Sequence, residues 1–327
     1  MSPTLLIGDP HFTTKNVQDV SIFSKKLEEW LKGNSVGRIV VMGDLLHRHE
    51  IVHTVSRNMA EGFIEMIRQY AEVVILVGNH DYINNTQFLS DQHWMNALKQ
   101  WERVVVVDRP VLIDGVVYCP YVYPGRFVEA LNYIDGGEEV WKGAEAIYCH
   151  QEFYGCKMGA IRSEIGDVWD ETYPMIYSGH IHDKQRPQPN IYYVGSSLQH
   201  SYGEKSNKSL LLVDRSKWIE EVFLKVPIKR TLYHTVDSLE KADIVGDDHT
   251  RITISGGSKE LDKFRKTKRC KDLVKQGIKI HYRKDVVKAI TKKASFTELL
   301  TDMIKEHPNR DALESLYATM IRECGTV

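Results

Sequence analysis

The sequence has no run that approaches the roughly 18 uninterrupted apolar residues of a membrane span, and its first eight residues are too short and too uncharged for a signal peptide. Its five cysteines are scattered without a C-x-x-C pair, so nothing indicates a disulfide framework or a thiolate zinc site. No internal repeat or low-complexity tract is evident. We therefore expect a soluble cytoplasmic protein whose thiols are free.

Charge is distributed unevenly along a chain whose formal net charge is only -1. Residues 259–293 carry 14 lysines and arginines against four acidic residues, which leaves a formal charge of about -11 on the remainder. Most charge runs form a solvated helix face, but a concentrated basic segment is also typical of a surface that contacts a polyanion. The segment is therefore a candidate nucleic-acid contact.

Short aliphatic runs in the first two thirds of the chain predict buried strands. Helical spacing lies between the early runs, as in the apolar residues from Val52 to Tyr70. This alternation predicts an α/β core, and the strands from Ile191 onward are expected to add an antiparallel set before the core ends near Pro227. The predicted strands are Leu5 to Ile7, Arg38 to Met42, Val73 to Val77, Val104 to Val107, Ala146 to Cys149, Met175 to Tyr177, Tyr192 to Val194, Ser209 to Val213 and Ile219 to Leu224.

A smaller α/β cap is expected after the core. It would contain a strand at Arg251 to Ile254, a basic helix around Leu261 to Gln276 and a strand at Ile278 to Tyr282. A capping-box pattern at Ser295 to Glu298, followed by two amphipathic runs separated by Pro308, predicts two short C-terminal helices. The predicted domains are residues 1–227 for the core, 228–290 for the cap and 291–327 for the C-terminal helices.

Five polar motifs stand directly after predicted strands. In α/β proteins the carboxyl ends of neighbouring strands meet at one crevice, so side chains far apart in sequence can converge there. Glycine lets the chain leave a strand tightly without a side chain that obstructs the site. The motifs are Gly8-Asp9-Pro10-His11, Gly43-Asp44-Leu45-Leu46-His47, Gly78-Asn79-His80-Asp81, Cys149-His150 and Gly179-His180-Ile181-His182.

The motifs deliver two carboxylates, one amide oxygen and several imidazoles. This mixed oxygen and nitrogen set suits borderline divalent metals such as manganese, iron or zinc. A single such motif would more often be a turn or a helix cap, and an isolated His150 would more often be a satisfied core histidine. Five motifs in order, ending in a His-x-His that can serve two neighbouring ions, make a chance arrangement implausible.

These motifs, in this order, resemble those of the calcineurin-like metallophosphoesterase superfamily. The resemblance implies a four-layer α/β/β/α core and a centre of two divalent ions that hydrolyses phosphoesters. It implies that Asp44 bridges the ions, that His47 orients the phosphate, and that His80 handles the proton of the leaving oxygen. Asp81, next in sequence, could fix the His80 tautomer. The other implied ligands are Asp9, His11 and His182 for one ion and Asn79, His150 and His180 for the other.

Beyond the metal motifs, the plan of the chain resembles the SbcD-type nuclease subunit, through the stretch Val194-Gly195-Ser196-Ser197, the following Tyr202-Gly203-Glu204, the cap and the C-terminal helices. This looser resemblance implies a manganese-dependent exonuclease or endonuclease in DNA repair or recombination, working as a homodimer with a coiled-coil, SMC-like ATPase. The basic cap supports DNA independently, because lysine and arginine attract a phosphate backbone without reading sequence. The candidate DNA contacts are Lys263, Lys266, Lys268, Arg269, Lys271 and Lys275.

Other readings fit the same residues. A small-molecule or nucleotide phosphodiesterase would use the same centre, with magnesium, iron or zinc as further candidate ions, and would gain nothing from DNA length. A catalytically silent scaffold would have no need of His47 and His80. The C-terminal helices could hold the ATPase or pack on the cap. The segment Phe88 to Leu98, with the helix Met59 to Tyr70, could form the dimer surface or belong to the chain's own core.

Overall fold

The computed structural model describes residues 2–214, 219–244, 246, 249–284, 300–301, 303–305 and 307–324. The chain forms two compact units. The first consists of Met1–Leu232, Asp243–Ile252 and Asp272–Ile280, and the second of Tyr233–Ala242, Thr253–Lys271 and His281–Val327. The domain boundaries at residues 227 and 290 remain predictions, and the capping box at Ser295 to Glu298 lies outside the described residues.

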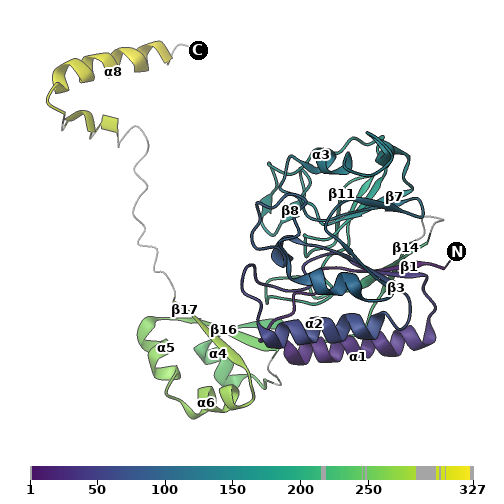
Figure 1. Cartoon of the computed structure of the whole chain (residues 1–327). Coiled ribbons are helices and arrows are strands. Elements are labelled where there is room, and N and C mark those ends of the chain that lie inside the picture. The colour runs from purple at the N-terminus through teal and green to yellow at the C-terminus, as the bar shows by residue number, and fades with distance from the viewer. Residues whose placement is uncertain are drawn as a thin grey trace. The chain divides into compact units, whose positions relative to one another are not determined.

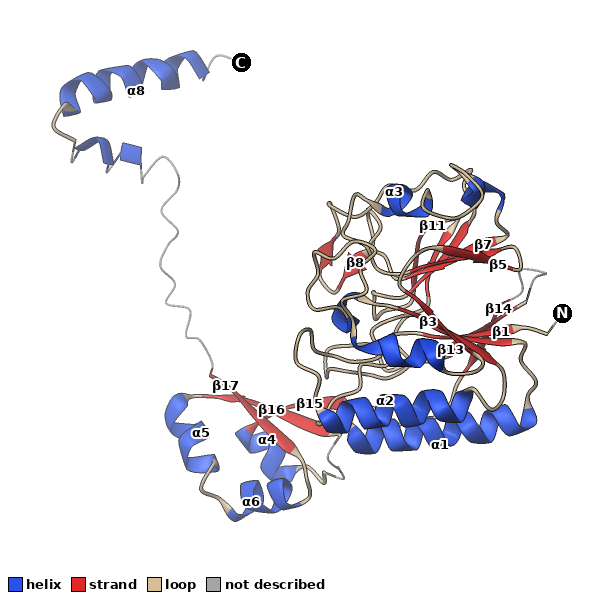
Figure 2. Cartoon of the chain, viewed as in Figure 1, coloured by secondary structure: helices blue, strands red, loops and turns tan. Residues whose placement is uncertain are grey.

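The first sheet of the first unit has six strands in the order β14-β13-β1-β2-β3-β4 (Figures 1 and 2). Strands β1 to β4 are parallel, whereas β13 is antiparallel to both β1 and β14. The aliphatic residues of β1, β2 and β3 are buried on both faces, as a parallel sheet covered on both sides requires. The strands are β1 Thr4–Ile7, β2 Arg38–Val41, β3 Glu72–Leu76, β4 Val104–Val107, β13 Leu210–Val213 and β14 Ile219–Val222.

The second sheet has the order β11-β12-β10-β7-β6-β5. Strands β6, β7, β10 and β12 run parallel, and antiparallel strands β5 and β11 close the two edges. The expected antiparallel set after Ile191 is found in β13 and β14, whereas β12 is antiparallel to β11 but parallel to β10. The strands are β5 Val111–Ile113, β6 Val116–Cys119, β7 Ala146–Cys149, β10 Met175–Ser178, β11 Gln185–Gln188 and β12 Ile191–Tyr193, and a hairpin of β8 Lys157–Met158 and β9 Ile161–Arg162 follows β7.

Three apolar clusters make this unit a four-layer α/β/β/α core. Leu5 and Ile7 face helices α1 and α2, whereas Leu6 between them faces the second sheet, as the period of two in a strand dictates. The outer face of the second sheet packs against α3, against Trp141 of a short 3-10 helix and against the loop around Trp169. The helices are α1 Val17–Gly33, α2 Thr54–Ile67 and α3 Phe127–Leu131, with short 3-10 helices η1 Asn79–Asp81, η2 Trp94–Gln100 and η3 Val140–Gly143.

The C-terminal part contains a three-stranded sheet in the order β15-β16-β17, accompanied by helices α4, α5 and α6. The single basic helix predicted from Leu261 to Gln276 is two helices. Thr267 separates them, because its hydroxyl donates to the carbonyl of Phe264 at 2.7 Å and accepts the N–H of Cys270 at 3.2 Å, which caps α6. The elements are β15 Arg230–Thr235, α4 Val236–Lys241, β16 Thr250–Gly256, α5 Ser258–Phe264, α6 Lys268–Lys275, β17 Lys279–Lys284 and α8 Arg310–Cys324.

Helix α8 follows Pro308, as the sequence predicted for the second C-terminal helix. Described residues between 300 and 305 are also helical, although most of the predicted first helix lies outside the described part of the chain. Among the described residues, no helix is long and apolar enough to cross a membrane.

Candidate metal centre

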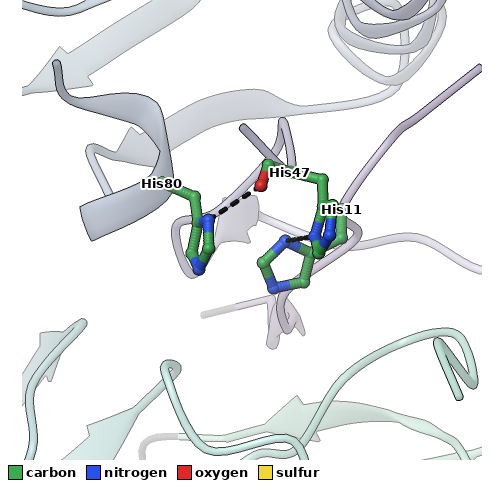
Figure 3. A group of neighbouring side chains, drawn as sticks. All are labelled: His11, His47 and His80. Carbon is green, nitrogen blue, oxygen red and sulfur yellow. Dashed lines mark hydrogen bonds between the residues drawn. The ribbon is translucent and has the colours of Figure 1, made fainter. Parts of the chain in front are cut away.

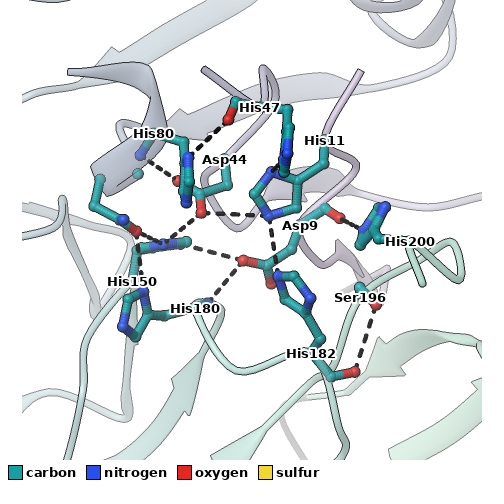
Figure 4. A network of polar contacts seen from close by, with 12 residues as sticks. Asp9, His11, Asp44, His47, His80, His150, His180, His182, Ser196 and His200 are labelled. Carbon is teal, nitrogen blue, oxygen red and sulfur yellow. Dashed lines mark hydrogen bonds and ion pairs between the residues drawn. The ribbon is translucent and has the colours of Figure 1, made fainter. Parts of the chain in front are cut away.

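The structure brings the predicted ligands together at the carboxyl ends of five strands. The loops after the adjacent strands β1, β2 and β3 supply four of them, and the loops after the adjacent strands β7 and β10 supply the other three. All come from the first unit. The convergence follows from the topology, because neighbouring parallel strands end at the same edge. Figure 4 shows the resulting network.

The backbone at the centre adopts conformations that are unfavourable for residues other than glycine. Asp9, His11, Asp44 and His180 all have positive φ angles, between 36° and 73°. Such angles in non-glycine residues persist only where the surrounding structure holds them, and they gather at functional sites. A Cβ on Gly78 would lie 2.2 Å from Asp44 Oδ1, so this strand exit requires glycine.

One group of donors gathers around His11. The Nε2 atoms of His11 and His182 lie 3.0 Å apart, and the Asp9 carboxylate stands beside them. The Asp9 side chain is held by the backbone N–H of His180, which donates to its Oδ1 at 2.8 Å. Asp9, His11 and His182 are the three ligands that the resemblance assigned to one ion.

A second group gathers around Asn79, and Asp44 lies between the two. Asn79 Oδ1 is 3.0 Å from both His150 Nε2 and His180 Nδ1. Asp44 Oδ2 lies 3.4 Å from His150 Nε2 and 3.5 Å from His11 Nε2, so it faces a member of each group. A residue in this position could contact two ions, which is the role that the resemblance implies for Asp44.

The chemistry of these donors fits divalent cations. Asp9 Oδ2 is buried without a hydrogen-bond partner among the described residues. Burial lowers the pKa of His11 well below its usual value, so this imidazole is neutral and keeps a lone pair. Burial opposes ionisation of Asp44, but His150 and His11 hold its pKa well below the usual range. Burial likewise lowers the pKa of His150, yet Asp44 and Asp9 raise it to about 9, so the two carboxylates draw positive charge into the centre.

The two predicted catalytic histidines lie at the rim of the centre (Figure 3). His47 Nδ1 is 3.3 Å from His11 Nδ1, and the His80 ring stacks on that of His47 with centroids 5.5 Å apart. His80 Nδ1 donates to the carbonyl of His47 at 2.8 Å, which fixes the His80 tautomer and leaves Nε2 available for proton transfer. The backbone N–H of His80 donates to Asp44 Oδ1 at 2.8 Å.

Asp81 does not orient His80, contrary to the expectation from their adjacency. Its Oδ1 accepts the N–H of Leu46 and the indole N–H of Trp94, at 3.1 and 3.0 Å, and its Oδ2 accepts the N–H groups of Leu45 and Gly78. Burial and the charge of Asp44 raise the pKa of Asp81 to about 7. Asp81 therefore ties the loop after β2 to the loop after β3.

Comparison with known proteins places the chain in a family. The family model described as calcineurin-like phosphoesterase matches residues 2–184. The chain belongs to the calcineurin-like phosphoesterase family. Two viral proteins are similar to this chain over most of their length. "Putative phosphoesterase 244L" of Invertebrate iridescent virus 6 is 42% identical, over 81% of this chain and 97% of the relative. "Putative phosphoesterase 078R" of Invertebrate iridescent virus 3 is 39% identical, over 98% of this chain and 96% of the relative.

A solved structure, that of Pseudomonas putida nuclease MPE, aligns with 67% of this chain and 87% of its own at 13% identity and a TM-score of 0.33. A likeness of that quality carries no inference about this phosphoesterase. Membership of the calcineurin-like family implies phosphoester hydrolysis by divalent metal ions. Bound ions of this kind generate a nucleophile from water at neutral pH and neutralise charge that develops on a phosphoryl group.

Two residues of the phosphoesterase centre escaped the sequence-based prediction. His182 Nδ1 donates to Glu204 Oε1 at 3.2 Å, which directs the His182 Nε2 toward His11. Burial would raise the pKa of Glu204, but hydrogen bonds from His182 and the His200 N–H lower it to about 2, so Glu204 is ionised. His200 Nε2 donates to the carbonyl of Asp9 at 2.8 Å. Glu204 had been noted only within the stretch Tyr202-Gly203-Glu204, without a role, and the His-x-x-x-Glu spacing in the loop after β12 was the other signal.

Glu204→Ala is expected to lower the affinity for divalent metal about 10- to 100-fold, because carboxylates that orient a ligating histidine contribute on that scale. Calorimetric titration of manganese into metal-stripped protein measures the affinity. Glu164→Ala, which removes an exposed glutamate elsewhere in the chain, is the matched control. An unchanged affinity for Glu204→Ala would show that the loop after β12 does not orient His182.

Proposed function

We propose that this phosphoesterase is a metal-dependent DNA nuclease, with manganese as its native ion, that processes DNA ends in repair or recombination. The centre supports phosphodiester hydrolysis, since it combines a bridging carboxylate position with His47 and His80 at its rim. The observation that favours DNA over a small diester is a row of exposed lysines in the cap. They are Lys263, Lys266, Lys268, Lys271 and Lys275, on α5, α6 and the link between them.

Arg269, also predicted as a DNA contact, has a structural task. Its Nη2 donates to the carbonyl of Ala242 at 2.6 Å, and its Nε is buried without a partner among the described residues. Leu261 and Phe264 are buried on the inner side of α5, whereas Lys263 on the same helix is exposed. Lysines on an exposed face attract a phosphate backbone without sequence preference.

We further propose that the C-terminal helices bind a coiled-coil, SMC-like ATPase. Their apolar side chains line a groove of about 290 Å³, and Met303, Leu316 and Met320 are 70%, 58% and 54% exposed. An apolar groove between helices suits recognition of another helix. A homodimer is also proposed, although Leu89, Met95 and Leu98 of the expected dimer surface are buried within the chain's own core. Sedimentation of the purified chain measures that association.

The double variant Lys266→Glu with Lys271→Glu is expected to bind DNA more weakly. The slope of log K against log salt should become smaller by about 1.8, because each phosphate contact with a duplex contributes about 0.9. Fluorescence anisotropy with labelled duplex, in chelator, measures both. Lys25→Glu with Lys241→Glu reverses two exposed lysines outside this row. Equal salt slopes in the two double variants would show that this row of lysines does not contact the DNA.

The direct test of the nuclease is hydrolysis of single- and double-stranded DNA beside a chromogenic diester, with manganese, magnesium or chelator. Metal-dependent cleavage of DNA that rises with its length is the expected result. Cleavage of nucleotides and the diester without any gain from DNA length would instead identify a small-molecule phosphodiesterase. Failure to hydrolyse any phosphoester would favour the silent scaffold.

A further inference from the structure

A groove of about 460 Å³ opens beside the metal centre within the first unit. Three histidines of the site, His11, His47 and His200, line one part of it. The loops after β1 and β2, the start of α2, and Tyr202, Lys229 and Lys279 line the rest. Of its 16 lining residues, four are lysine or arginine and none is acidic. Three of the four cations come from outside residues 259–293, a part of the chain whose formal charge is about -11.

Two of the four cations have neither an ion pair nor an aromatic partner among the described residues. Lys15 and Arg48 are exposed, and neither forms an ion pair with a carboxylate of the described residues. Lys229 differs, because its Nζ lies 3.2 Å from Asp19 Oδ2. Lys279 lies over the ring of Tyr202, 5.5 Å from its centroid. A groove of this composition concentrates positive potential and attracts anions.

The loop that carries Lys15 is fixed to the centre. Asn16 Oδ1 accepts the N–H of Thr13 at 2.8 Å, and Asn16 Nδ2 donates to the carbonyl of His11 at 3.0 Å. Arg48 directly follows His47, whose ring touches that of His11. Both cations therefore lie on segments that also carry residues of the centre. From there they can contact the part of a substrate next to the phosphate that reacts.

We propose that this groove binds the sugar-phosphate backbone of the DNA strand that adjoins the scissile phosphate, with Lys15 and Arg48 contacting its phosphates. The assignment rests on the proposed nuclease function and names where its substrate lies in the core. A mononucleotide or a small diester has no further backbone phosphates to place along the groove. A polynucleotide gains a charge contact with each phosphate that it places there.

The test is the double variant Lys15→Gln with Arg48→Gln. Binding of a labelled single-stranded oligonucleotide is measured by anisotropy in chelator across a salt series. We expect about tenfold weaker binding at low salt and a salt slope smaller by about 1.4, since each lost phosphate contact of a single strand contributes about 0.7. Lys25→Gln with Lys241→Gln is the matched control and should bind as the wild type does.

Turnover with manganese gives the second readout. The double variant should lose at least ten times more kcat/KM on DNA than on the chromogenic diester, with an unchanged metal content. If the wild type cleaves DNA and the variant keeps the full salt slope, the groove is not the backbone site, whereas the proposed nuclease function is retained. Equal losses on both substrates would mean that the two cations act in the reaction itself, and would exclude the groove as a binding site for the DNA backbone. A wild type that hydrolyses the diester but neither binds nor cleaves DNA overturns both proposals.

Discussion

Asp44→Ala is expected to lower hydrolysis of a chromogenic phosphodiester by at least about a thousandfold and to reduce the bound metal. Asp44 Oδ2 faces both donor groups, through His11 and His150, so its loss removes a charge from both metal positions at once. Stabilisation of transition-state charge by a metal pair amounts to several kcal/mol, and each 1.4 kcal/mol is a factor of ten in rate. Steady-state kinetics and elemental analysis of the same preparation measure the two effects.

Because Asp44 is buried, the alanine variant could also lose its fold. Asp44→Asn keeps the shape of the side chain and an oxygen for the His80 N–H, so it separates charge from packing. Circular dichroism should show native melting for the asparagine variant together with the loss of activity. Asp91→Ala, an exposed aspartate, is the control for metal content. Full activity of a well-folded Asp44→Asn protein would exclude Asp44 as the bridging ligand.

His80→Ala is expected to retain metal but to lose about a hundredfold to ten-thousandfold in kcat, the contribution typical of a positioned acid or base. The structure explains why metal should stay. It is the backbone N–H of His80 that holds Asp44 Oδ1, and this N–H persists in the alanine variant. The imidazole, fixed by the carbonyl of His47, is what the variant removes. Elemental analysis beside turnover of the diester separates the two roles.

The matched control for His80 is His281→Ala, which removes an exposed histidine of the cap. His80 also lies close enough to His11 and His47 for the three rings to hold an ion together. An emptied centre in His80→Ala would therefore mean that His80 is a ligand, and its assigned role in proton transfer would be wrong. Intact turnover would remove it from the chemistry.

The location of the site at the carboxyl ends of the strands was predictable, because two local sequence signals coincide there. Apolar runs such as those before Gly8 and Gly43 mark buried strands, and the polar residues that follow must lie at the strand ends. Strands with weaker patterns were missed, among them β11, whose Gln185–Gln188 sequence has no aliphatic residue. Edge strands are specified by their partner more than by their own residues.

Side-chain contacts between residues that only the fold brings together were harder to predict from the sequence. Asp81 neighbours His80 in sequence, but the 3-10 helix η1 turns its carboxylate toward Leu45, Leu46 and Trp94. Glu204 reaches His182 from 22 residues later in the chain, well beyond the end of β12, so its position did not mark it as part of the site. Sequence adjacency therefore gave a wrong partner for His80, and sequence distance concealed the right one for His182.

The most direct test of the central claim is to count ions and activity together in the wild-type chain. Protein stripped by chelator is titrated with manganese while bound ions per chain and hydrolysis of the chromogenic diester are followed. A two-metal centre predicts no hydrolysis in the stripped protein and full recovery as the count reaches two. Hydrolysis that survives in the stripped protein, or a fully occupied centre that hydrolyses no phosphoester, would contradict it.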